Sequence, residues 1–142
     1  MKRFLMSVIV LLFVSSSAFG DVPSPEYTRR RERMLEGKLM VNVYASELGD
    51  NALVCHIDIH GEGSYSYSIS NKETGDVIYS GSDESLGTTS IGRTWKYETP
   101  EEGKSMRYEV SASFDSVRRG KTEITKNITV RNIKGVINIV IE

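Results

Sequence analysis

From Lys38 to the end of the chain, apolar side chains return at every second position, which is the strongest constraint on the fold. Such alternation is typical of β-strands that bury one face, and stretches rich in Gly, Asn, Asp and Ser separate the alternating segments. The clearest segment is 106–114, where Met, Tyr, Val, Ala and Phe alternate with polar residues. The strands we expect are residues 39–45, 53–60, 64–70, 77–79, 91–97, 106–114, 124–130 and 136–141. The pattern therefore predicts an all-β fold, an antiparallel β-sandwich of about seven to eight strands with turns at 61–63 and 81–89.

The first twenty residues have the features of a secretory signal peptide. Lys2 and Arg3 precede an apolar run over 4–14, and small residues end the segment at Gly20. The run is shorter than the roughly 20 apolar residues that cross a bilayer, and we expect no transmembrane segment after signal removal. The expected organisation is a signal peptide over 1–20, an N-terminal arm or short helix over 21–37 and a β-sandwich domain over 38–142, exported to the periplasm or the extracellular space.

Residues 21–37 carry helix start and stop signals. Ser24 is a favourable N-cap, Pro25 a favourable first helical residue, and Gly37 a favourable terminator. Few apolar residues lie between them, so a short helix and a flexible arm fit the segment equally well.

Charge and cysteine content narrow the function classes. The 18 basic residues include Lys2 and Arg3, so the processed chain has 16 basic and 19 acidic residues and a net charge of −3. This balance argues against nucleic-acid binding, which relies on neutralising phosphates. Cys55 is the single cysteine, so an intramolecular disulfide is excluded, and the alternation places its side chain on the apolar face of its strand.

The strand pattern over 38–131 resembles that of immunoglobulin-like and fibronectin type III-like sandwiches. Tyr108, two residues before Val110, occupies the place of the tyrosine corner in that architecture. Val110 stands where an immunoglobulin domain has its second cysteine, and Trp95 comes late for the third strand. The layout also resembles that of the small periplasmic curli-assembly chaperones, over the segments 51–59, 64–70 and 75–82. That resemblance implies an immunoglobulin-like protein that keeps amyloid subunits from nucleating; the N-terminal arm and the strand after Val130 depart from it.

One constellation has the residue types of a metal site. His56, Asp58 and His60 alternate along one strand and share a face, as ligands of Zn²⁺ or Cu²⁺ would. The competing interpretation is a solvated strand face, because the chain has no further His or Cys cluster to complete the site. No nucleophile motif is present, so we expect a non-enzymatic protein without a catalytic residue or cofactor.

Candidate partner-binding residues are basic or aromatic side chains in three segments. They are Arg29, Arg30, Arg31, Arg33, Tyr65, Tyr67, Arg118 and Arg119. Short basic clusters are also typical of ordinary solvated surface. The apolar strand at 136–141 has two interpretations: it completes its own sheet, or it adds to the sheet edge of a neighbour and makes an oligomer.

These observations favour an exported binding or chaperone-like module that acts on a protein partner outside the cytoplasm through a sheet face or an edge strand. One alternative is a metal-binding periplasmic protein that uses His56, Asp58 and His60. Another is a structural subunit of a surface fibre that uses its C-terminal strand.

Overall fold

The computed structural model describes residues 24–142, and contacts divide the chain into two units, Met1–Met34 and Leu35–Glu142. The signal peptide predicted over 1–20 lies outside the described residues. The helix α2 spans Pro25–Leu35, so the helical alternative for the N-terminal segment is confirmed. Ser24 caps it, because its Oγ accepts the Tyr27 N–H at 3.3 Å and its carbonyl accepts the Thr28 N–H at 3.0 Å. Gly37 follows the helix with a positive φ of 82°, as a terminating residue should.

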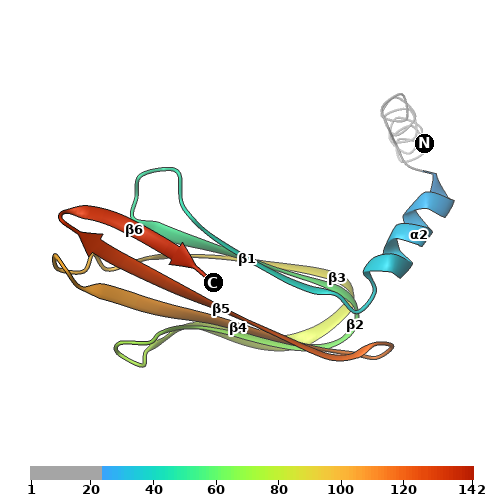
Figure 1. The fold of residues 1–142 in the computed structure, drawn as a ribbon. Helices are drawn as coiled ribbons and strands as arrows, with labels where there is room; N and C mark the ends of the chain where they lie inside the picture. The colour runs from blue at the N-terminus through green and yellow to red at the C-terminus, as the bar shows by residue number, and fades with distance from the viewer. Residues whose placement is uncertain (1–23) are drawn as a thin grey trace, which may run out of the picture. The chain divides into compact units, whose positions relative to one another are not determined.

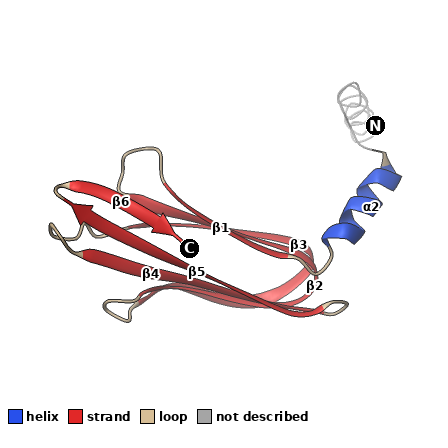
Figure 2. Ribbon diagram, in the orientation of Figure 1, coloured by secondary structure: helices blue, strands red, loops and turns tan. Residues whose placement is uncertain are grey.

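The second unit is all-β and antiparallel, which confirms the predicted class (Figure 2). Its strands are β1 (Leu39–Ala45), β2 (Ala52–Asn71), β3 (Val77–Lys96), β4 (Ser105–Ser116), β5 (Gly120–Ile133) and β6 (Val136–Ile141). They form one hydrogen-bonded sheet in the order β1-β2-β4-β5-β6, and β3 pairs with β2 along its other edge. Within residues 24–142, no helix is long and apolar enough to cross a membrane.

The predicted turn at 61–63 and the predicted loop at 81–89 are wrong. The chain continues through both places in extended conformation, so β2 and β3 are each 20 residues long and pair along their whole lengths. Four predicted short strands are therefore two long ones, and the structure describes six strands in place of seven to eight. The side chains of β2 keep their alternation through this region, which is why the strand can continue.

Glycines let the long hairpin bend where the turn was expected. Gly61 has a φ of 120°, which side-chain-bearing residues rarely adopt, and Gly87 lies opposite it in β3. Gly63 is in close contact with the neighbouring strand, since a Cβ added there would collide with the Asp115 carbonyl and touch the Phe114 ring. Glycine inside a strand commonly marks such a bend or a close backbone approach.

Because β2 bends, its two halves pair with different strands along the same edge. Residues 53–59 of β2 pair with β1, and residues 63–71 pair with β4. The two halves of β3 approach each other, because the Tyr79 hydroxyl donates to the Thr94 carbonyl at 3.0 Å. The sheet thus curls until it is nearly closed, and all six described strands belong to one hydrogen-bonded sheet (Figure 1). The sandwich predicted from the sequence does not appear as two separate sheets, because the described strands form this one curled sheet.

The core lies inside the curled sheet and consists of the alternating apolar residues that the sequence predicts. Cys55 is buried among them, which confirms its predicted place on the apolar face. Tyr108 is also buried, and its ring meets that of Trp95 edge to face, with centroids 6.0 Å apart. The Tyr108 hydroxyl accepts the Glu98 backbone N–H at 3.2 Å, and burial raises the pKa of Tyr108.

Candidate functional site

The His56, Asp58 and His60 side chains lie on the outer face of β2, as their alternation predicts. The Tyr44 hydroxyl lies 3.0 Å from His56 Nε2, and the two rings stack with centroids 5.8 Å apart. Asp58 accepts the Ser90 hydroxyl at 2.8 Å from the neighbouring strand β3. Two of the three proposed ligands therefore have partners in the sheet itself.

No group of three or more His, Cys, Asp or Glu side chains within the described residues is arranged to hold a metal ion. The metal-binding alternative stays a prediction, and this arrangement does not add support to it.

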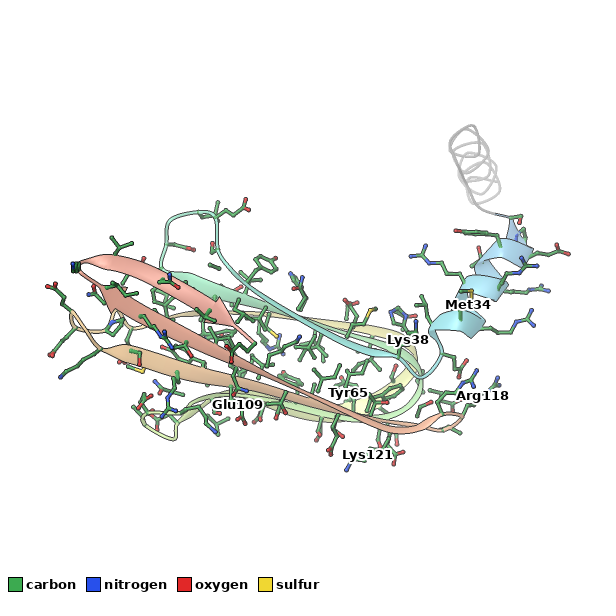
Figure 3. The ribbon with its side chains drawn as sticks, viewed as in Figure 1. Met34, Lys38, Tyr65, Glu109, Arg118 and Lys121 are labelled. Atoms are coloured by element: carbon green, nitrogen blue, oxygen red, sulfur yellow. The ribbon has the colours of Figure 1, made fainter. Side chains whose placement is uncertain are left out.

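The basic residues predicted to bind a partner fall in two places. Arg29, Arg30, Arg31 and Arg33 are exposed on α2. Arg118 and Arg119 are exposed in the turn between β4 and β5, where Arg118 Nε lies 3.8 Å from Glu36 Oε1 (Figure 3). In the second unit this turn and Lys121 together form a basic tip. The Lys121 Nζ lies 3.1 Å from Glu123 Oε1.

The tyrosines of the predicted binding surface point to the inside of the sheet. Tyr67 is buried and Tyr65 is half-buried against the core. The outer face at this place carries hydroxyl groups instead, and they line an open hollow of about 400 Å³. Its polar lining comes from Ser66, Ser68, Ser111, Ser113, Glu123 and Thr125. The outer face of the sheet therefore presents these polar groups rather than the Tyr65 and Tyr67 rings.

Arg93 joins the two halves of the curled sheet. Its Nη2 and Nε donate to the Tyr67 hydroxyl at 2.9 and 3.2 Å, and its guanidinium lies 5.7 Å from the centre of the Tyr67 ring. The Tyr79 ring lies on it as well, at 5.6 Å. Sequence reasoning missed this cluster, because Arg93 meets the tyrosines only after the β2–β3 hairpin has bent.

The outer edge of β3 has no neighbouring strand among the described residues, but side chains occupy several of its hydrogen-bonding groups. The Tyr97 N–H donates to the Asn51 carbonyl at 2.9 Å. The backbone N–H and C=O groups of the odd-numbered residues in this part of β3 therefore point toward β2, and those of the even-numbered residues point toward the open edge. On the outward side, Arg93 donates to the Gly92 carbonyl at 3.0 Å, and the Thr94 carbonyl accepts the Tyr79 hydroxyl. The Glu84 N–H donates to the Asp83 carboxylate at 2.8 Å. Charged and capped groups of this kind protect an edge from unwanted pairing.

The outer edge of β6 is different, because five of the six residues from 136 to 141 are Val or Ile and none is charged. Asn127 and Glu142 exchange two hydrogen bonds of 2.9 Å, so the alternation of the ladder turns the backbone groups of Ile137, Ile139 and Ile141 away from β5. No described strand pairs with that side. The sequence identified the strand, but it could not show that only one of its edges is paired.

Exposed apolar side chains gather near this edge. Val136 is 67 % exposed, and Ile133, its partner across the hairpin, is 51 % exposed. Lys134 and Gly135 both have positive φ, which fixes the hairpin in a tight two-residue turn and holds β6 in register with β5. The β6 edge is therefore a largely apolar strand edge that is held in register with β5 and that no described strand pairs with.

Cys55 gives a prediction that follows from its burial. Burial raises the pKa of the Cys55 thiol from 9.0 to about 11. The folded state therefore resists ionisation, and the stabilisation that it gains is complete below pH 9 and is lost as the pH rises toward 11. We expect the free energy of unfolding, measured in urea, to fall more steeply over that range in the wild type than in Cys55→Ala. Parallel pH profiles of the two proteins would contradict the assignment.

The chain matches no protein-family model, and neither the curated proteins nor the solved structures provide a significant match.

Proposed function

We propose that this chain is an exported, non-enzymatic binding module with a chaperone-like role, which captures an extended segment of a protein partner on the outer edge of β6. The observation that carries the proposal is the unpaired, apolar and uncharged edge of that strand. Strand addition to such an edge supplies main-chain hydrogen bonds for affinity, while the alternate side chains give selectivity. The favoured ligand is an uncharged segment rich in β-branched residues, which is also the composition of amyloid-forming segments.

The contrast between the unpaired edges of β3 and β6 supports the choice of β6 over β3. The edge of β3 is longer, but Arg93, Tyr79 and Asp83 occupy hydrogen-bonding groups along it. At β6 the outward backbone groups of Ile137, Ile139 and Ile141 have no such side-chain partner in the described chain. A partner strand would therefore replace no internal hydrogen bond at β6, whereas at β3 it would first have to remove several.

The resemblance to immunoglobulin-like domains and curli-assembly chaperones belongs to the same proposal. It is supported by Tyr108, whose buried hydroxyl bonds to the backbone upstream at Glu98, as the hydroxyl of a tyrosine corner does. A chaperone of amyloid subunits would need an edge that takes up extended, apolar segments, and β6 offers one.

The test is an aggregation assay with a synthetic amyloid-forming peptide whose core is uncharged and rich in Val and Ile. A substoichiometric amount of the protein should lengthen the lag phase of thioflavin fluorescence. Ile139→Pro should abolish the delay, because proline removes an outward N–H and leaves the bonds to β5 in place. Trp95 fluorescence checks that the variant is folded. If Ile139→Pro does not fold, Ile141→Pro changes the same edge at the strand end, where its side chain is 36 % exposed.

Ser82→Pro is the matched control, because Ser82 is exposed and its N–H faces the outer edge of β3. This variant should delay aggregation as the wild type does. If Ser82→Pro loses the delay and Ile139→Pro keeps it, the partner binds at the edge of β3 and not at the edge of β6. An unchanged lag phase with the wild-type protein would refute the proposed function.

A further inference from the structure

We infer that in the absence of a partner the β6 edge is covered by the β6 edge of a second copy of this chain, in an antiparallel two-fold pair centred on Ile139. The inference rests on the proposed function, because it concerns the same strand edge. It states what covers that edge when no partner is bound. It starts from the fact that an apolar edge strand with free backbone groups is unfavourable in water and pairs readily with another strand.

The register follows from which residues face outward. Ile137, Ile139 and Ile141 present their backbone groups to the open edge, so they must form the hydrogen-bonded pairs with a second copy. A two-fold axis at Ile139 places Ile139 opposite its equivalent and Ile137 opposite Ile141 of the second copy. All three outward residues then form hydrogen-bonded pairs, whereas an axis at Asn138 leaves Ile141 opposite the turn residue Gly135.

The side chains in this register fit one another. Each pair on the inner face joins two isoleucines, and β-branched pairs across strands are stabilising. On the outer face Asn138 lies opposite Val140 of the second copy. No charged residue occurs from 136 to 141, so the two copies bring no like charges together within the paired stretch. The strand can therefore pair with itself without a clash of like charges, and with isoleucine opposite isoleucine on the inner face.

The same geometry sets the size and the symmetry of the assembly. A single strand pair buries less than the roughly 1,200–2,000 Å² of a stable interface, so the dimer should be weak and should exchange with the monomer. Such an interface leaves the edge accessible to a partner that binds more tightly. A two-fold contact also uses the same surface on both copies and closes on itself, so it makes dimers and does not propagate into a fibre.

Cross-linking tests the register in a Cys55→Ala background. Paired residues at the axis have Cα atoms about 5.5 Å apart, which lies within the range that a disulfide spans. Ile139→Cys should therefore form a disulfide-linked dimer on mild oxidation. Ile141→Cys is the matched control on the same edge and the same face, because its two copies would lie more than about 13 Å apart. Equal cross-linking of the two variants, or none with Ile139→Cys, would overturn the register.

Sedimentation of the otherwise unmodified protein tests the dimer itself. We expect a concentration-dependent equilibrium between monomer and dimer, loss of the dimer in Ile139→Pro, and its retention in Ser82→Pro. A wild-type protein that stays monomeric at all concentrations would refute the dimer. If that monomer still delays peptide aggregation, the proposed function stands without the dimer; a dimer that forms without any delay would refute the proposed function alone.

Discussion

Gly63→Ala is expected to lower the free energy of unfolding by about 3 kcal/mol, because the new methyl group collides with the neighbouring strand. The nearest atoms to an added Cβ are the carbonyl oxygen and carbon of Asp115, followed by the Phe114 ring. Backbone atoms of a paired strand cannot move aside as a flexible side chain does, and overpacking of such sites costs about 1–3 kcal/mol or more. The β2–β4 pairing at this point must loosen. Urea unfolding followed by Trp95 fluorescence measures the change.

Gly87→Ala is the control for this prediction. Gly87 lies in β3 opposite Gly61, close to the same bend, but nothing lies within 4 Å of an added Cβ. Its φ lies outside the range that side chains avoid, so the substitution should leave stability unchanged or raise it by up to about 1 kcal/mol. Equal losses in the two variants would show that flexibility at the bend, rather than the close approach at Gly63, is what the fold requires.

Tyr108→Ala is expected to cost about 3–5 kcal/mol of folding free energy, the usual loss for a fully buried aromatic side chain. The ring is 2 % exposed and packs against Trp95, so its removal leaves a cavity in the core. Chemical denaturation monitored by circular dichroism is the suitable measurement, because the substitution alters the surroundings of the fluorescent Trp95.

Tyr108→Phe separates the hydroxyl from the ring. It keeps the packing but removes the acceptor of the Glu98 N–H, so it should cost about 1 kcal/mol. A loss as large as that of Tyr108→Ala would mean that the hydrogen bond, rather than ring packing, holds the segment after β3 on the core. Wild-type stability in Tyr108→Phe would mean that the bond contributes nothing measurable.

The alternation of apolar residues predicted the strands and their inner faces, because burial of one face acts on every residue of a strand. The bounds of β1 and the burial of Cys55 follow from it directly. The bend of β2 could not be predicted in this way. Gly61, Glu62 and Gly63 have the composition of a turn, and whether such a segment reverses the chain or bends it depends on the strands that pair alongside.

The open edge at the candidate site could not be predicted from local alternation either. The sequence indicated that 136–141 is a strand, but its open edge depends on the order of strands in the finished sheet. Among the side-chain caps on β3, the bond from the Tyr79 hydroxyl to the Thr94 carbonyl depends on the bend, because it joins residues that are 15 positions apart in the chain. By contrast, His56 and Asp58 were placed correctly on one face, because local alternation alone determines their direction.

The strand order has a consequence for how fast the chain reaches its native state. Within residues 24–142, four of the five pairings join strands that follow one another in the chain, and only β2 with β4 brings together strands separated by another strand. Hairpins between consecutive strands form in microseconds, whereas closure of a long loop carries a larger entropic barrier. The docking of β4 on β2 past Gly63 is therefore the step that should limit the folding rate, with the hairpins on either side already formed.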